Sequence, residues 1–243
     1  MAHDAPAHDA RVMSSARPLG RPRLHLRTTA STNDRARALA TAGAPHGTLV
    51  TAGEQTAGRG RQGRTWAAPP GRALLCSLVL REHDALLPLR AGLAVADLAG
   101  EHALVKWPND VLLDGRKLAG ILVEARPDAG WAVLGIGVNV AIDPATLPAG
   151  VREHAATLGR PPAALEGTLA ELLGRLAVRH AEPPAACLAA LRARDALRGR
   201  PVRWADGDGT GAGIDDAGAL LVRLPDGTLR TLDAGEVHLG AAS

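Results

Sequence analysis

The chain has 243 residues, of which 46% are hydrophobic and 22% charged, so it is long enough for one large domain or a moderate domain with a small appendage. The net charge of +3 is too small to indicate nucleic-acid binding by itself, and no apolar run approaches the roughly 20 residues that span a bilayer. Two cysteines, Cys76 and Cys187, are too few for a disulfide framework or a four-cysteine metal site, which favours a cytoplasmic protein without a protein-held metal.

The N-terminal part of the sequence predicts a helix whose first residues are polar. Residues 1 to 20 lack hydrophobic periodicity and predict a disordered leader. A short strand over residues 24 to 27 leads to a helix that begins at Ser31 or Thr32. Ser31, Thr32 and Asn33 therefore lie at a helix N-terminus, where N–H groups and small polar side chains can bind a ligand. Simple helix capping explains the same residues.

A strand over residues 48 to 52 runs into a glycine-rich segment, GEQTAGRGRQGRTW, at residues 53 to 66. The glycine spacing fits G-x-G-x-x-G, but the tryptophan and prolines that follow cannot open the helix that a dinucleotide-binding loop requires. We therefore reject a Rossmann site. Because Arg59, Arg61 and Arg64 place fixed charges among glycines, we predict a loop that holds an anion. A surface loop with solvated arginines is the alternative.

The segment KWPNDVLLDGRKLAGILVEA, residues 106 to 125, predicts a hairpin with its turn at Asp114-Gly115. Gly120 in the second arm permits close approach of a backbone or a ligand. Asn139 is polar within the apolar run WAVLGIGVNV, so it requires a hydrogen-bond partner from the backbone or a ligand. The other predicted elements are strands at 73–80 and 131–140 and helices at 86–102, 161–181 and 184–197.

The pattern changes from Gly199 onward. Short alternating segments, RPVRWA, GALLVRL and GTLRTL, are separated by the turn sequences DGDG, DDAG and PDG. This composition predicts a small β-barrel. We therefore divide the chain into a leader at residues 1–20, a larger domain at 21–198 and a small β domain at 199–243.

Three motifs, GRGRQGRTW, KWPNDVLLDGRKLAGILVE and GIGVN, closely resemble in this order and spacing the signature of biotin protein ligases. The resemblance implies an α+β fold: a catalytic domain like that of class II aminoacyl-tRNA synthetases, with a mixed sheet and helices, followed by a small SH3-like β-barrel. No winged helix-turn-helix precedes the catalytic part, so the resemblance is to the ligases without a DNA-binding domain.

The resemblance also implies the reaction. Such a ligase makes biotinyl-5′-adenylate from biotin and ATP, with Mg²⁺ accompanying ATP, and transfers biotin to one lysine of the biotin carboxyl carrier domain of acyl-CoA carboxylases. The first step brings two anions together, so its site must supply cations and exclude water, and it needs no protein nucleophile. A homodimer is compatible with this function.

Site residues follow from the same resemblance. Lys117 would neutralise the biotin carboxylate and α-phosphate, and Asp110 would orient or deprotonate the incoming lysine. The catalytic residues would be Lys117, Asp110 and Arg59. Biotin would contact Ser31, Thr32, Asn33, Gln55, Arg59, Gly60, Arg61 and Lys117. ATP would contact Arg61, Trp66, Lys106, Asn109, Lys117 and Asn139.

Two alternatives remain at this stage. Lipoate ligases and octanoyl transferases share the fold superfamily, but their signatures are not matched here. A non-enzymatic module that senses an adenylate or binds RNA is a different class of function. A passive binder would not need Lys117 and Asp110 beside the arginine loop, so the sequence favours the ligase.

Overall fold

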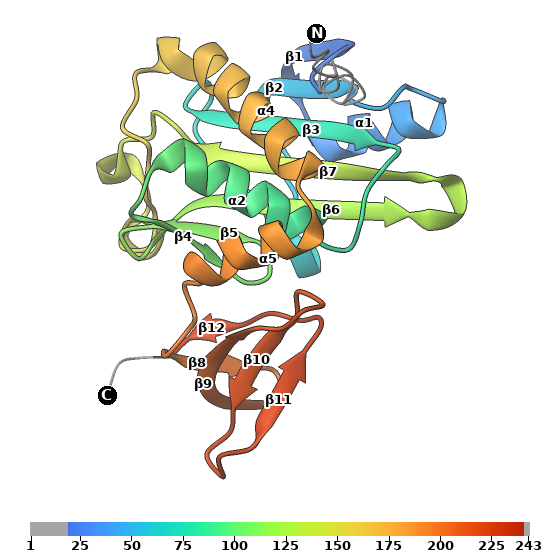
Figure 1. The fold of residues 1–243 in the computed structure, drawn as a ribbon. Helices are drawn as coiled ribbons and strands as arrows, with labels where there is room; N and C mark the ends of the chain where they lie inside the picture. Colours follow the sequence, from blue (N-terminus) through green and yellow to red (C-terminus); the bar gives the residue numbers. More distant parts are fainter. Residues whose placement is uncertain (1–18, 241–243) are drawn as a thin grey trace, which may run out of the picture.

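The computed structural model describes residues 19–240, so the predicted leader lies almost wholly outside the described residues. Within this range the larger sheet has seven strands in the order β1-β2-β3-β7-β6-β5-β4 (Figure 1). β1 and β2 are parallel and all other neighbours are antiparallel. The strands are β1 (Arg23–Thr29), β2 (Leu49–Gln55), β3 (Ala73–Leu80), β4 (Ala103–Lys106), β5 (Asp110–Leu113), β6 (Arg116–Arg126) and β7 (Trp131–Asn139).

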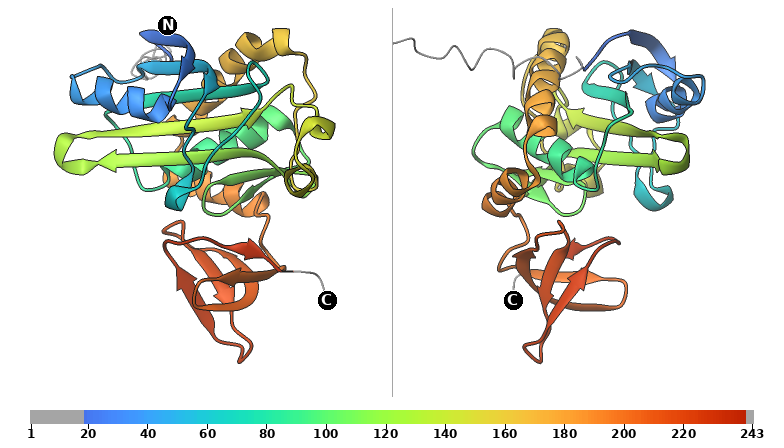
Figure 2. Two further views of the ribbon diagram at one scale, coloured as in Figure 1. Left: turned by 180° about the vertical axis from the view of Figure 1, so that it is seen from behind. Right: turned by 45° about the vertical axis from the view of Figure 1, so that its right-hand side comes forward.

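Helices cover both faces of this sheet. α2 (Leu87–Ala99), α4 (Leu165–Ala181) and α5 (Pro184–Ala193) lie on one face, and α1 (Thr32–Thr41) lies on the other, as the view from behind in Figure 2 shows. Successive side chains of a strand point to opposite faces. In β3 they divide between two cores, with Leu78 in the core that holds α2 and α4, and Val79 in the core under α1. We call the face under α1 the site face.

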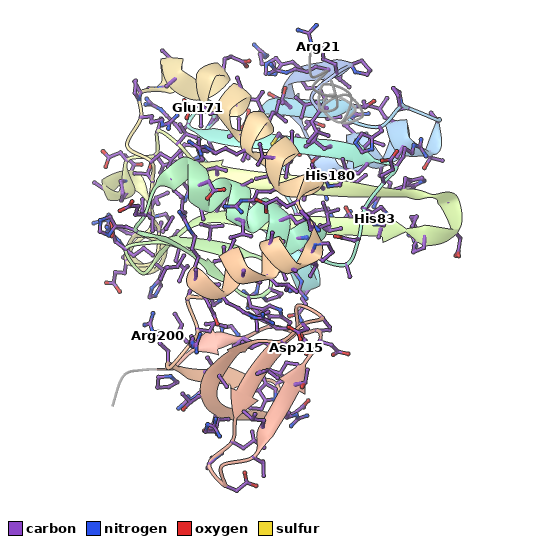
Figure 3. The ribbon with its side chains drawn as sticks, in the orientation of Figure 1. Arg21, His83, Glu171, His180, Arg200 and Asp215 are labelled. Carbon is purple, nitrogen blue, oxygen red and sulfur yellow. The ribbon has the colours of Figure 1, made fainter. Side chains whose placement is uncertain are left out.

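A second sheet of five antiparallel strands, in the order β11-β10-β9-β8-β12, lies below the first in Figure 1. Trp107 Nε1 donates a hydrogen bond of 3.0 Å to the carbonyl of Gly218, and Leu220 continues the main hydrophobic core. Figure 3 labels Arg200, which directly precedes β8, and Asp215, which directly follows β9, as well as Glu171 and His180 along α4. The strands are β8 (Pro201–Trp204), β9 (Gly207–Ile214), β10 (Leu220–Arg223), β11 (Leu229–Leu232) and β12 (His238–Leu239).

The predicted α+β class is confirmed, as a mixed sheet with helices followed by an antiparallel β region. The predicted hairpin turn is also present, since Asp114 and Gly115 both have positive φ, 50° and 76°. The division of the chain at residue 199 stays a prediction. Among residues 19–240, no helix combines the length and the hydropathy required to cross a membrane.

Some element boundaries differ from the predictions. DGDG was predicted as a turn, but β9 begins inside it at Gly207. The helix predicted from residue 86 to 102 ends at Ala99, because Gly100 has a φ of 98°. The helices predicted over 161–181 and 184–197 are shorter, and Pro161 precedes a 3-10 turn. The remaining short elements are η1 (Arg61–Gly63), η2 (Pro127–Ala129), η3 (Pro144–Thr146), η4 (Pro162–Ala164) and α3 (Ala149–Arg152).

Candidate active site

A cavity lies on the site face, between the N-terminus of α1 and strands β6 and β7. Three glycines of these strands, Gly120, Gly135 and Gly137, leave room for side chains from elsewhere in the chain. A Cβ at Gly135 would collide with the amide of Asn33, and one at Gly137 would lie 2.6 Å from the indole of Trp66. The close approach predicted at Gly120 is therefore made by a side chain, because Trp66 would lie 3.1 Å from its Cβ.

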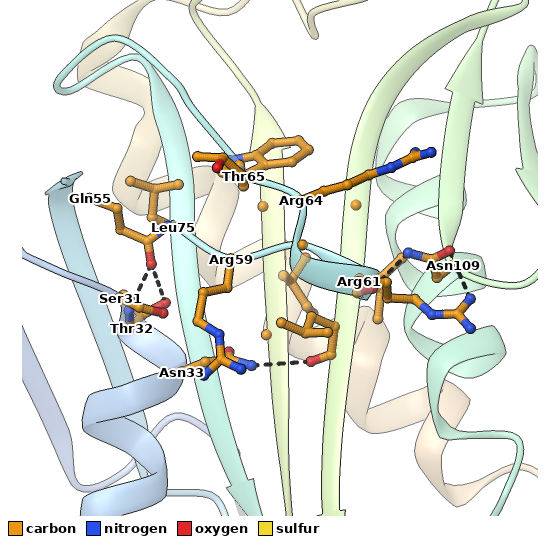
Figure 4. Close-up of a pocket in the computed structure, with 18 of the residues that line it drawn as sticks. Ser31, Thr32, Asn33, Gln55, Arg59, Arg61, Arg64, Thr65, Leu75 and Asn109 are labelled. Carbon is orange, nitrogen blue, oxygen red and sulfur yellow. Dashed lines mark hydrogen bonds between the residues drawn. The ribbon is translucent and has the colours of Figure 1, made fainter. Parts of the chain in front are cut away.

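Polar groups converge at the N-terminus of α1. The side-chain oxygen of Gln55, at the end of β2, accepts hydrogen bonds from the backbone N–H and the hydroxyl of Thr32, at 2.7 and 2.9 Å. Ser31 occupies the N-cap position but its side chain makes no capping bond. Ser31 and Thr32 are both buried, and both line the cavity (Figure 4). Gln55 thus satisfies the first N–H of α1, and the Ser31 side chain caps no N–H at all, so simple capping does not explain Ser31.

Residues 58–66, which we call the lid hairpin, fold over the cavity. Gly60 N–H donates to the carbonyl of Arg64 at 2.7 Å, and Trp66 N–H donates to the carbonyl of Gly58 at 2.9 Å. At its tip Gln62 has a φ of 52°. The arginine-bearing loop therefore has a defined backbone that presents its side chains around the cavity.

The three arginines of the lid hairpin contact different elements. Arg61 donates to the amide oxygen of Asn109 at 3.3 Å (Figure 4), and Arg64 forms an ion pair with Glu236, in the connection between β11 and β12. Arg59 contacts two carboxylates, Asp34 at 2.8 Å and Glu124 at 3.2 Å. Hydrogen bonding to Asp34, and then the charge on Glu124, raise the pKa of the Arg59 guanidinium above its usual range.

Asp110 lies between two lysines. Its carboxylate is 2.7 Å from Lys117 Nζ and 3.6 Å from Lys106 Nζ. Lys106 and Asp110 face each other across the β4–β5 pair, and Lys117 comes from the neighbouring β6. Lys117 Nζ also lies 5.8 Å from the centroid of the Trp66 ring, within the range of a cation–π contact. The site therefore presents a lysine cation beside a carboxylate and an aromatic ring.

The structure brings together all but two of the predicted site residues. Lys106 and Asn139 do not line the cavity. The Asn139 amide donates to the backbone carbonyls of Ala156 at 2.9 Å and Lys117 at 3.4 Å, so it fixes the backbone at Lys117. The predicted residues that line the cavity are Ser31, Thr32, Asn33, Gln55, Arg59, Gly60, Arg61, Trp66, Asn109, Asp110 and Lys117.

Four contributing residues were not predicted. Ser77 is fully buried and lies 2.6 Å from the Asn33 amide oxygen and 2.8 Å from the Thr32 hydroxyl. Its one local signal, which the sequence analysis did not use, is a serine within the apolar run ALLCSLVL. Asp34, Glu124 and Glu236 are unremarkable in sequence, and only the fold brings them to the lid hairpin.

Cys76 is among the residues around the cavity, but its side chain packs in the core on the opposite face of the sheet. Its thiol is buried, which raises its pKa to about 12. A thiol with this pKa is protonated at neutral pH, and the thiolate is the reactive form. The assignment of Cys76 to the core therefore agrees with its environment.

Comparisons with known proteins match both parts of the chain. The model of the Biotin/lipoate A/B protein ligase family matches residues 26–141, and that of the Biotin protein ligase C terminal domain matches residues 199–240. The biotin--[acetyl-CoA-carboxylase] ligase of Paracoccus denitrificans is 38% identical, over 88% of this chain and 99% of the relative. The bifunctional ligase/repressor BirA of Bacillus subtilis is 33% identical, over 86% of this chain and 71% of the relative.

Solved structures agree with these matches. Biotin protein ligase from Aquifex aeolicus in complex with biotin and ATP superposes with a TM-score of 0.77 at 26% identity, over 90% of this chain and 99% of that chain. The ligase from Leishmania major in complex with biotinyl-5-AMP gives a TM-score of 0.57 at 25% identity, over 87% and 98%. The resemblance seen in the three motifs thus extends over both sheets. The chain belongs to the biotin protein ligase family.

Proposed function

We propose that the chain activates biotin with ATP and transfers it to a lysine of a biotin carboxyl carrier domain. The observation that carries this proposal is the position of Lys117, which lies beside Asp110 and Trp66 in a cavity covered by the arginines of the lid hairpin. A cation among anion-binding groups, with no activated protein nucleophile nearby, suits an attack of one anion on another.

In the first step, a biotin carboxylate oxygen attacks the α-phosphorus of ATP. A new O–P bond forms, the bond to the bridging oxygen breaks, and pyrophosphate leaves. Lys117 offsets the repulsion between the two anions, because its single charge can follow the charge that develops on the phosphate. Arg59 and Arg61 cover the carboxylate and the phosphate, and the polar side chains of Ser31, Thr32, Asn33 and Gln55 receive the ring end of biotin.

In the second step, the carrier lysine attacks the carbonyl carbon of the adenylate and AMP leaves. The incoming ammonium must lose a proton before it can attack, and Asp110 is the carboxylate beside Lys117 that can accept or orient it. The N–C bond forms as the C–O bond to AMP breaks. The neutral indole of Trp66 provides the face for adenine, and Asn109, which Arg61 contacts, lies on the nucleotide side.

Mg²⁺ would accompany ATP. Among residues 19–240 no group of three or more His, Cys, Asp or Glu side chains converges on one point, so phosphate oxygens and water would supply most of its ligands. The proposal assigns no DNA or membrane partner. It places the reaction in the cytoplasm, where the two free cysteines stay reduced. A homodimer is compatible with this activity.

Pyrophosphate release tests the activity and its substrate class. The purified protein is incubated with ATP, Mg²⁺ and one of three acids: biotin, lipoate or octanoate. Of the three, we expect only biotin to cause release of pyrophosphate. A carrier domain should then gain the mass of one biotinyl group, and a carrier whose acceptor lysine is replaced by arginine should gain none. Faster release with lipoate or octanoate than with biotin would contradict the assignment.

A further inference from the structure

An alternating network of charges joins the lid hairpin to the sheet. Asp34 Oδ1 lies 2.8 Å from both Arg59 and Arg37, and Glu124 Oε1 lies 3.2 Å from Arg59 and 3.3 Å from Arg37. Asp34 and Arg37 belong to α1, Glu124 to β6 and Arg59 to the lid hairpin. Each carboxylate therefore contacts two guanidinium groups, and the lid hairpin is tied to both walls of the cavity.

The second oxygen of Glu124 has a different partner. Asn33 Nδ2 donates to Glu124 Oε2 at 2.8 Å and approaches the carbonyl of Leu122 at 3.5 Å. Both of these groups can only accept, so the nitrogen of the Asn33 amide must face them and its oxygen must face Ser77. Asn33 is buried, and Gly135 leaves the room that its amide occupies. Glu124 thus fixes the orientation of an amide that lines the cavity.

We propose that Glu124 is a positioning residue that connects recognition of the biotin ring to closure of the lid hairpin. One oxygen orients Asn33 at the ring end of the site, and the other holds Arg59 at the mouth. Arg37 also contacts Asp34 and Glu124, so both carboxylates keep a positively charged partner when Arg59 moves toward the anion of the substrate. The proposal rests on the proposed function, in which Asn33 binds biotin.

Two substitutions of Glu124 separate its roles. Glu124→Gln keeps an oxygen that can accept from Asn33 but removes the charge that attracts Arg59, whereas Glu124→Ala removes both. Asp34→Asn weakens the hold on Arg59 and leaves the contact to Asn33 intact. Glu166→Gln is the matched control, because Glu166 forms a two-point ion pair with Arg23 away from the cavity.

Biotin affinity is measured by titration calorimetry without ATP, and hydrogen exchange reports residues 58–66. Loss of a charged hydrogen bond to a buried amide should weaken biotin binding by about tenfold in Glu124→Ala. Glu124→Gln should recover most of that affinity. All three substitutions at Asp34 and Glu124 should speed exchange in the lid hairpin, and Glu166→Gln should not.

The results distinguish this inference from the proposed function. If the parent protein binds no biotin, the proposed function fails. If the parent binds biotin and Glu124→Ala binds it equally well, or if Glu124→Gln loses as much affinity as Glu124→Ala, the positioning role of Glu124 is wrong. Unchanged exchange in the lid hairpin of every variant would also overturn it. The Glu124 side chain is partly exposed. If Glu124→Ala does not fold, the affinity and hydrogen exchange of Glu124→Gln still decide the test.

Discussion

Asp110→Asn should separate the two half-reactions. The substitution preserves the size of the side chain and removes its charge. In the parent, Asp110 contacts Lys117 at 2.7 Å and Lys106 at 3.6 Å. A carboxylate beside a triphosphate cannot assist adenylate formation electrostatically, but it can assist the loss of a proton from the carrier lysine. We therefore expect adenylate to form and its transfer to be slow.

The structure allows the two effects to be compared. The side chain of Lys117 is 39% exposed, so its ion pair with Asp110 is screened by water and is worth at most about 1 kcal/mol. Loss of that pair should change the rate of adenylate formation by no more than about fivefold. Loss of a general base costs about 10²- to 10⁴-fold. The transfer step should thus suffer at least an order of magnitude more than the first step.

Single-turnover measurements of each half-reaction give the answer. Pyrophosphate release reports adenylate formation, and the mass of the carrier domain reports transfer from preformed biotinyl-adenylate. Asp128→Asn, in the exposed turn between β6 and β7, is the matched control and should match the parent in both steps. If Asp110→Asn transfers preformed adenylate at the parent rate, Asp110 is only a structural residue at the start of β5, and its catalytic role is refuted.

Four further predictions concern the same site. Lys117→Gln should slow adenylate formation by roughly 10²-fold or more, as loss of one charge-stabilising group does, while Arg116→Gln on the exposed neighbour should not, both measured by pyrophosphate release. Arg61→Ala should still form adenylate but release it faster, so that unrelated proteins become biotinylated; loss of synthesis without such labelling would exclude the lid role. Gly135→Ala should weaken biotin binding by about tenfold or more, because a Cβ collides with Asn33, whereas Gly150→Ala, with nothing within 4 Å, should not. Cys76, whose pKa burial raises to about 12, should resist iodoacetamide at pH 8 in the native protein and react once the protein is unfolded in guanidinium, as mass spectrometry can show.

The sequence predicted the parts of the site that lie within short motifs. Asp110 and Lys117 come from one hairpin, so its turn at Asp114-Gly115 was enough to place them on neighbouring strands. Helix and strand periodicity likewise placed most elements of the larger sheet. The contacts of Arg59 could not be predicted in this way, because Asp34 and Glu124 belong to other elements and carry no pattern that points to the lid hairpin.

β9 was missed because its sequence, GDGTGAGI, is poor in the residues that favour strands. Its glycines are required by close packing. A Cβ at Gly209 would lie 2.8 Å from the side chain of Val222 on β10, and one at Gly211 would collide with the backbone of Leu197. A glycine that marks a turn in isolation can therefore mark a crowded strand in a small sheet, and only tertiary contacts distinguish the two.

The contacts of the lid-hairpin arginines affect the free energy with which they could bind the substrate anion. The sequence by itself shows only three fixed positive charges among glycines, without partners. In the structure Arg59 contacts Asp34 and Glu124, Arg61 contacts Asn109, and Arg64 contacts Glu236. In the proposed function, anion binding by these arginines is therefore an exchange of partners, and its free energy is the difference between two sets of contacts. Arg37 remains beside both carboxylates that Arg59 would leave, so the exchange does not strand an unpaired charge at the wall of the cavity.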